Sequence, residues 1–260
     1  MTFPRRSVPT LFFLWLLVAA QSAPADGQVV LLKPGETLSY RVGWGPLGHA
    51  GDIMVTAAAE VVDGQTRTRM TTTTATRGFV RVIYPFDGEA GMLFDPADGR
   101  LLSASASTQG GGSKTKASIA FDYVTGKASY VDHLRPERNT TLPLPDGHLM
   151  DMITSLIQTR VWALAPGDSR EVWVLFDDEF YPLRITAERE ETIATPKGPR
   201  KTVLLVPRMI GKPKGMFRRG GEVHVWVSAD ADRLPLRFEV KLKVGTAFAV
   251  LTDYRPPSAP

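Results

Sequence analysis

The sequence contains no cysteine, and this absence excludes several kinds of site. Disulfide scaffolds, thiolate nucleophiles, iron–sulfur clusters and cysteine-based zinc sites all depend on the missing side chain. We also expect no lipoprotein anchor, because its attachment requires a cysteine to acylate. What remains is a chain of 260 residues, 43% hydrophobic and 22% charged, which is the composition of a globular protein.

Short catalytic motifs are missing as well. The chain has no G-x-S-x-G elbow, no H-E-x-x-H zinc helix and no G-x-G-x-x-G turn. Residues 110–115 (GGGSKT) imitate a phosphate loop, but their spacing is wrong and they lie between two predicted strands, so we interpret them as a hairpin tip. A histidine metal site would have to be assembled from distant strands, because no two of the four histidines are close in sequence: His49, His133, His148 and His224. We predict no catalytic residues, no metal and no cofactor.

Only one long apolar run is present, and it lies near the start of the sequence. Residues 11–20 (LFFLWLLVAA) follow Arg5 and Arg6 and precede an A-x-A sequence at 23–25. This order is typical of a cleavable signal peptide, and the run is shorter than the ~20 residues that a spanning helix needs. The sequence therefore predicts a signal peptide over 1–25, export to the periplasm, and no transmembrane segment after cleavage. An uncleaved anchor is the alternative.

The rest of the chain has the alternating pattern of β-strands. Short runs rich in Thr, Val and aromatic residues are separated by Gly, Pro and Asp-Gly turns, of which Asp63-Gly64 is the strongest hairpin pattern. Tight turns between consecutive strands predict antiparallel pairing. No linker divides the chain, so we expect one β-rich domain over 26–254 and a disordered tail over 255–260. The predicted strands are 37–44, 50–62, 65–76, 88–95, 100–109, 114–123, 127–133, 170–177, 180–191, 199–207, 222–228, 233–243 and 245–253.

One segment has helical spacing instead. Apolar residues between Leu149 and Val161 recur every three or four positions, Asp146 is a candidate N-cap, and 165–167 (APG) would end the helix. The predicted helix, 147–164, is apolar over much of its circumference, which indicates enclosure on several sides. The fold predicted is therefore mainly β: a single strongly curved antiparallel sheet, a half-barrel, wrapped around one apolar helix.

Basic and apolar residues are concentrated in the segment 206–221 (VPRMIGKPKGMFRRGG), which has no acidic residue. Such a Gly-rich connection can place apolar side chains against a lipid or partner while its cations meet phosphates or carboxylates. The plainer alternative is a solvated loop whose apolar residues pack on the core. The candidate ligand or membrane contacts are Arg208, Met209, Ile210, Lys212, Lys214, Met216, Phe217, Arg218 and Arg219.

Two further kinds of segment contain charged residues that could be functional. Residues 77–86 (RGFVRVIYPF) also combine cations with aromatic residues and form a second candidate contact. The acidic residues at 177–179 and at Asp230 and Asp232 are interpreted as turns. Nucleic acid is not an expected partner, because basic residues barely outnumber acidic ones in the mature chain. Cleavage of the signal peptide removes Arg5 and Arg6 from the 31 basic residues, and the formal net charge falls from +4 to +2.

Residues at both ends of the predicted domain resemble a known family. Residues 35–44 (GETLSYRVGW) with Ala50-Gly51 resemble the opening of the domain of unknown function 3108 family, and 226–237 (WVSADADRLPLR) resemble its closing motif. The helix containing Asp151 and the residues Glu191-Thr192 and Gly198 fall between them in the expected order, so the resemblance covers about residues 31–253. We interpret the motif residues as architectural: Trp44, Trp226, Asp230, Asp232, Arg233 and Pro235. In particular, Arg233 can pair with one of the two aspartates, and Pro235 suits an edge strand or a bulge.

The resemblance implies an exported envelope protein of Gram-negative bacteria. Its implied shape is similar to that of the periplasmic lipoprotein carriers, a curved sheet that covers a helix and leaves an apolar cavity. The family has no established activity, so it contributes no functional residue. The leading hypothesis is non-catalytic binding of a lipid or of an acylated or amphipathic ligand in envelope maintenance. The alternatives are an envelope protein-interaction module with a filled interior, and an enzyme acting on cell-wall or surface polymers.

Overall fold

A single fifteen-stranded sheet dominates the computed structural model, which describes residues 32–45, 48–147, 149–162, 164–176, 178–211, 221–241 and 245–257. The strand order is β8-β7-β6-β5-β4-β3-β2-β1-β15-β14-β13-β12-β11-β10-β9. The strands are β1 (Thr37–Trp44), β2 (His49–Val62), β3 (Gln65–Thr76), β4 (Phe86–Phe94), β5 (Leu101–Gly110), β6 (Ser113–Asp122), β7 (Lys127–Asp132), β8 (Thr140–Pro143), β9 (Leu149–Asp151), β10 (Ser169–Phe176), β11 (Glu179–Thr195), β12 (Gly198–Met209), β13 (Glu222–Ser228), β14 (Pro235–Lys241) and β15 (Thr246–Arg255). Each predicted strand overlaps an observed one, whereas β8 and β9 are not among those predicted.

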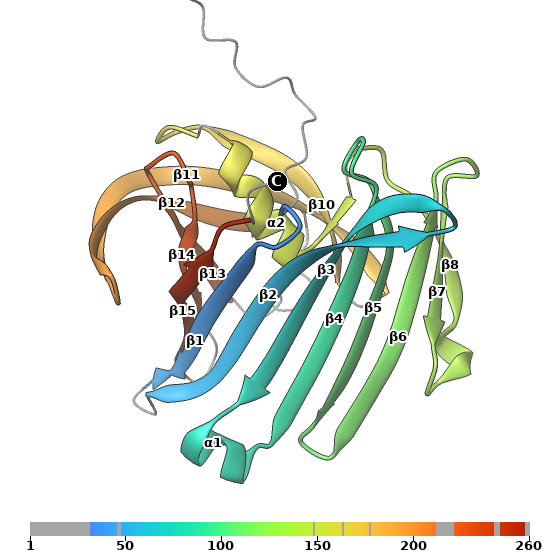
Figure 1. Cartoon of the computed structure of the whole chain (residues 1–260), viewed down its shortest axis with the longest axis horizontal. Coiled ribbons are helices and arrows are strands. Elements are labelled where there is room, and N and C mark those ends of the chain that lie inside the picture. Colours follow the sequence, from blue (N-terminus) through green and yellow to red (C-terminus); the bar gives the residue numbers. More distant parts are fainter. Residues whose placement is uncertain are drawn as a thin grey trace, which may run out of the picture.

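The first and last strands meet in the middle of this sheet. β1 pairs with β15 from Thr37↔Arg255 to Trp44↔Ala247, so the chain begins and ends its sheet at neighbouring positions. From β1 the chain runs outward by consecutive antiparallel strands to β8, and from β10 it returns in the same way to β15 (Figure 1). The edge strand β9 is parallel to β10 and is joined to it through α2. Two meanders are thus joined along one central strand pair.

The sheet curls strongly, although it does not close into a barrel. β8 and β9 are its two edge strands, and they are consecutive in the chain: β8 ends at Pro143 and β9 begins at Leu149. Six Cα–Cα steps span at most about 22 Å, so the two edges lie within that distance of each other. Among the described strands, β8 and β9 do not pair with each other, so the sheet is open. The prediction of a single curved sheet that does not close is confirmed.

The predicted helix over 147–164 is wrong in its extent. The helical turns are α2 (Met152–Gln158) and a 3₁₀ turn, η3 (Thr159–Val161), while Leu149–Asp151 is strand β9, parallel to β10. Asp146 does not cap the helix; Asp151 does, because its Oδ1 accepts the backbone N–H of Thr154 at 3.2 Å. Apolar residues at helical spacing also suit a short buried strand, and pairing with Trp173–Leu175 decides the outcome.

Two other short helical elements connect strands: α1 (Gly78–Ile83) between β3 and β4, and η2 (Pro136–Arg138) between β7 and β8. The fold is thus a sheet with a few short helices rather than a sheet around one long apolar helix. None of the helices among the described residues is long and apolar enough to span a membrane.

The hairpins follow the turn chemistry of the sequence. Asp63 and Gly64 have φ values of 51° and 75°, the two positive values of a type I′ turn, and they join Val62 directly to Gln65 in register. The glycine tip at 110–115 is likewise a tight turn between β5 and β6, with Gly110 opposite Ser113. Where each strand alternates, its apolar residues form the inner face of the sheet.

Part of the interior enclosed by this face is filled. Phe94, Leu101 and Ile157 are at most 2% exposed and belong to one cluster, which joins both meanders through α2. This cluster is shared between the two halves of the sheet, whereas a second cluster, which includes Val174, Ile185 and Val225, lies within the β9–β14 half alone.

Candidate functional site

An apolar pocket of about 240 Å³ lies on the inner face, where the two meanders join. Its walls come from β1, β2, β13, β14 and β15, with one residue from α2. The lining residues are Leu38, Tyr40, Val42, Ile53, Val55, Ile157, Val223, Pro235, Phe238, Val240, Ala247, Phe248 and Ala249. Almost no polar surface faces this space, so any ligand portion held there must itself be apolar.

Small side chains on β15 create the space. Ala249 lies opposite both Val42 of β1 and Phe238 of β14, and Ala247 lies opposite Val240. Large residues on the neighbouring strands therefore face methyl groups instead of meeting comparable side chains. Strand alternation identifies these positions as inward-facing, but only the β1–β15 pairing reveals that the alanines stand between the large residues.

Tyr40 closes one side of the pocket without bringing a charge into it. Its hydroxyl donates a hydrogen bond of 3.1 Å to the backbone carbonyl of Pro235, and its ring lies 5.3 Å from that of Phe238. Burial strongly raises the pKa of Tyr40, although the positive charge of Arg160 partly opposes the rise. The phenol therefore stays neutral and remains a donor at any physiological pH.

A wider depression of about 680 Å³ lies across β1 to β5 on the opposite, outer face of the sheet. Most of its lining residues alternate along their strands with the inward-facing Tyr40, Ile53 and Thr74: Ser39, Asp52, Met54, Thr73, Ala75, Asp87, Glu89, Ser107 and Gln109. The Phe86 ring, which lies over the inner side of Gly88, does not line it. The depression is therefore separate from the apolar pocket.

A buried ionic cluster fixes the far end of α2, whose Ile157 lines the pocket. Glu36 is 2% exposed; its Oε1 accepts hydrogen bonds from Arg160 at 3.0 Å and from the Tyr254 hydroxyl at 2.8 Å. Arg160 also donates from Nε to the backbone carbonyl of Asp232 at 3.2 Å. Burial and the bond to Glu36 raise the pKa of Tyr254. The cluster ties η3 to the chain before β1, to β15 and to the turn before β14.

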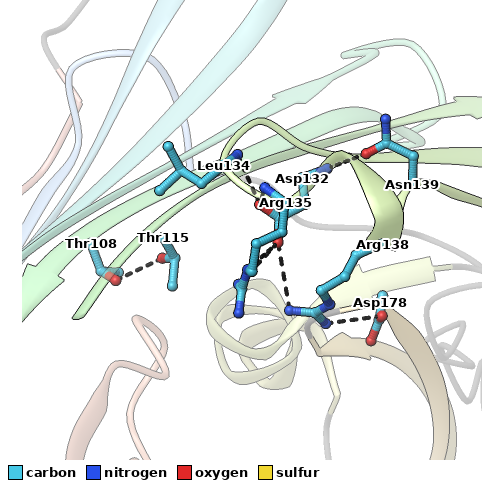
Figure 2. Close-up of polar contacts among 8 residues, drawn as sticks. All are labelled: Thr108, Thr115, Asp132, Leu134, Arg135, Arg138, Asn139 and Asp178. Atoms are coloured by element: carbon cyan, nitrogen blue, oxygen red, sulfur yellow. Dashed lines mark hydrogen bonds and ion pairs between the residues drawn. The ribbon is translucent and has the colours of Figure 1, made fainter.

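A second ionic cluster connects segments near the two edges of the curled sheet (Figure 2). Asp132, at the end of β7, is 1% exposed; it accepts backbone N–H groups of Leu134 and Arg135, each at 3.0 Å, and the Arg135 guanidinium. Arg138 lies 3.6 Å from Asp132 and 3.0 Å from Asp178, which stands in the turn between β10 and β11. The rings of Phe121 on β6 and Phe180 on β11 also contact each other, with centroids 6.4 Å apart. Side chains thus connect the two halves of the sheet, whose edge strands β8 and β9 do not pair with each other.

Hydrogen bonds keep the Asp132 carboxyl group of this second cluster ionised. Burial by itself raises the pKa of Asp132, but the backbone N–H groups of Leu134 and Arg135 and the guanidinium of Arg135 outweigh it and hold the pKa below its ordinary value of 3.8. The carboxylate therefore stays ionised at neutral pH and can hold the arginines.

The predicted architectural residues of the closing motif lie around one turn. Asp230 accepts the Ser228 hydroxyl at 2.7 Å and pairs with Arg200, and these bonds lower the pKa of Asp230 against the opposing effect of burial. Arg233 adopts a φ of 46° and donates to the carbonyl of Trp162 at 2.5 Å rather than to an aspartate carboxylate. The register shifts opposite Pro235, inside the sheet and not at its edge.

The two tryptophans of the predicted motifs lie apart from the pocket lining. Trp226 is 8% exposed; its Nε1 donates to Glu191 at 2.8 Å, and Arg237 stacks over its ring at 5.5 Å. Trp44 ends β1 and is 38% exposed. Neither ring lines the pocket, although both residues lie on strands, β1 and β13, that build it.

The candidate contacts in 206–221 are only partly placed. Arg208 pairs with Glu188 at 2.6 Å, Met209 packs against the core, and Ile210 is 36% exposed. Lys212, Lys214, Met216, Phe217, Arg218 and Arg219 lie outside the described residues, as do the predicted signal peptide, His148 and Asp177. Val223, just after this segment, lines the apolar pocket.

The described histidines are separate from one another. His49 pairs with Asp52 at 2.7 Å, His133 with Ser118 at 3.0 Å, and His224 lies 4.0 Å from Glu222. Within the described parts of the chain, no group of three or more His, Asp or Glu side chains is arranged to hold a metal ion. Leu38, Tyr40, Val42 and Pro235 of the pocket lie in the two family motifs, but nothing in the sequence indicated that they line a shared space.

Comparison with known proteins gives a family and a fold. Residues 39–252 match the model of the family described as "Protein of unknown function (DUF3108)". The β-barrel-like protein of domain of unknown function DUF1849 from Brucella abortus superposes with a TM-score of 0.56 at 8% identity, over 88% of this chain and all of that one. A Bacteroides fragilis protein with a YmcC-like fold reaches only 0.34 at 12% identity, over 88% and 99% of the two chains. No curated protein matches the chain significantly.

Proposed function

This chain belongs to the DUF3108 family, and from that premise we propose that it binds a lipid or another acylated or amphipathic molecule in the cell envelope, without catalysing a reaction. The observation that carries the proposal is the apolar pocket of about 240 Å³. A filled core would exclude a ligand, and the pocket-lining alanines of β15 keep this part of the interior unfilled.

The arrangement around the pocket suits an amphipathic ligand. Its acyl portion would displace water from a lining that offers almost no polar partner. The polar portion would remain outside the pocket, because the lining offers it almost no hydrogen-bond partner. Burial of apolar surface is worth about 25 cal/mol per Å², so even a partly inserted chain gains several kcal/mol.

The envelope location belongs to the same proposal. It is supported by the predicted signal peptide over 1–25 and by the absence of cysteine from the sequence. After export, the chain would act in the periplasm as a carrier or sensor of its ligand. The basic and apolar segment 206–221 would then adjoin the pocket through Val223.

The experiment is to fill the pocket. In Ala249→Phe, the added ring would occupy the space between Val42 and Phe238, and we expect at least about tenfold weaker binding of a fluorescent fatty acid. Ala58→Phe places the same ring on an exposed position of β2 and serves as the matched control.

Lipid co-purified with the native protein, detected by native mass spectrometry and lost in Ala249→Phe, would add independent support. Equal fatty-acid binding by Ala249→Phe and Ala58→Phe, with both variants folded, would overturn the proposal. It would favour instead a protein-interaction module.

A further inference from the structure

The helix α1 exposes an unusual amount of apolar surface. Phe79, Val82, Ile83 and Tyr84 are 67%, 79%, 60% and 49% exposed, and we call these four residues the α1 tip. Single exposed apolar residues are common on soluble proteins, but a contiguous group of large ones marks a contact surface. Figure 1 shows α1 projecting from one end of the sheet, beyond the ends of the strands and away from α2.

The neighbouring strands hold the α1 tip in this outward position. Val80, within the same helix, is 5% exposed and anchors it. Arg81 donates to both carboxylate oxygens of Asp87, at 3.0 and 2.9 Å, and Arg77 donates to Asp52 at 2.8 Å. These ion pairs fasten both ends of α1 to β2 and β4. Its apolar side chains therefore stay in solvent instead of folding back onto the sheet.

Charge divides the two ends of the sheet. Because consecutive antiparallel strands turn at alternate ends, the turns fall into two sets. The described connections at the α1 end carry four arginines, Arg77, Arg81, Arg135 and Arg138, against the acids Glu137 and Asp178. The described connections at the opposite end carry more acids than cations: Asp63, Asp95, Asp98, Asp146, Asp168, Asp230 and Asp232 against Arg100, Arg160, Lys197 and Arg233.

We propose that the α1 tip inserts into the interface of a membrane that carries anionic phospholipids. Aromatic and aliphatic side chains enter the boundary between headgroups and acyl chains, while adjacent arginines meet phosphate groups. The opposite, aspartate-rich end would be repelled by the same surface, so the molecule would approach with α1 leading. A projecting helical turn needs no matching concavity in its partner, which suits a bilayer better than a folded protein.

This surface lies close to the candidate pocket. α1 follows β3 and is held to β2, whose Ile53 and Val55 line the apolar pocket. Docking through α1 would thus bring the pocket to the source of an apolar ligand. The inference does not rest on ligand binding, and the two can fail separately: fatty-acid binding tests the pocket, and vesicle binding tests the α1 tip.

The natural absence of cysteine allows a direct test. Val82→Cys and Val124→Cys each introduce one site for an environment-sensitive fluorophore. Val124 is 97% exposed in the turn between β6 and β7, at the opposite end of the sheet. With vesicles of phosphatidylethanolamine and phosphatidylglycerol, we expect a blue-shifted, brighter emission from the probe at 82 and no change at 124. Absence of a vesicle-dependent change at 82, or equal changes at both sites, would overturn the proposal.

Flotation with the same vesicles measures the energetic contribution. Val82→Glu should weaken binding at least about tenfold, whereas Val124→Glu should leave it unchanged, with equal unfolding temperatures confirming that both variants fold. Binding to vesicles of phosphatidylcholine alone should be weaker than to the anionic vesicles. Equal binding to both lipids would refute the role of charge, and a lipid-independent dimer that Val82→Glu dissociates would assign the surface to a second copy of the chain.

Discussion

Removing the buried carboxylate of Glu36 is the perturbation with the largest expected effect on this fold. In Glu36→Ala, the Arg160 guanidinium, 14% exposed, loses its partner at 3.0 Å, and the Tyr254 hydroxyl loses its acceptor at 2.8 Å. The backbone N–H of Lys33, which donates to the second carboxylate oxygen, is left unpaired as well. Removing one member of a buried ion pair costs about 3–5 kcal/mol, because the remaining charge stays desolvated.

The unfolding assay gives this prediction a definite scale. For a chain of this size, about 3–5 kcal/mol corresponds to a fall in Tm of about 6–20 °C, measurable by circular dichroism alongside urea unfolding. Glu60→Ala is the matched control, since the Glu60–Arg69 pair is 38% and 35% exposed and is screened by solvent, so its loss should change Tm far less.

A double-mutant cycle separates the ion pair from other effects of the substitution. Because Glu36 and Arg160 act as one unit, Glu36→Ala combined with Arg160→Met should be less unstable than the sum of the two single variants. If Glu36→Ala changed stability by no more than Glu60→Ala, the idea that this cluster fixes α2 would be refuted.

Two other predictions concern the sheet itself. The pKa of Asp132 is lower in the folded protein than in the unfolded chain, so its contribution to stability is complete above about pH 4 and is lost as the pH falls further; Asp132→Asn should remove this part of the acid dependence in urea titrations at stepped pH. Gly43→Ala should destabilise the protein by about 1–3 kcal/mol, because a Cβ at this position would stand 2.2 Å from the Phe248 ring; unchanged urea midpoints would contradict that packing argument.

The sequence was a good guide wherever neighbours in the chain make the structure. Alternation along residues such as 65–76 predicts a strand with one buried face, and Asp63-Gly64 predicts the hairpin that follows β2. Turn chemistry and side-chain alternation act over a few residues, so they can be recognised without knowing the fold. The family resemblance, quoted from 35–44 and 226–237, is confirmed by the match over 39–252.

Local pattern was a poor guide where two structures suit the same residues. Leu149, Met150 and Asp151 fit the amphipathic spacing of a helix, yet they pair with Trp173, Val174 and Leu175 as a parallel strand. A buried strand and a buried helix are both apolar, and only the presence of a partner strand decides between them. The strand β8 was missed for another reason: Thr140–Pro143 has only four residues, mostly exposed, and therefore too short an alternation to recognise.

The sequence alone therefore determined the strands, their tight turns and the family, since each depends on residues that are close together in the chain. Only the tertiary structure decided that β1 pairs with β15, that α2 is short, and that a pocket remains between Val42, Phe238 and Ala249. Glu36 meets Arg160 and Tyr254 across 124 and 218 residues. Contacts over such separations form when a curled sheet brings distant strands together, and no local pattern in the sequence records them.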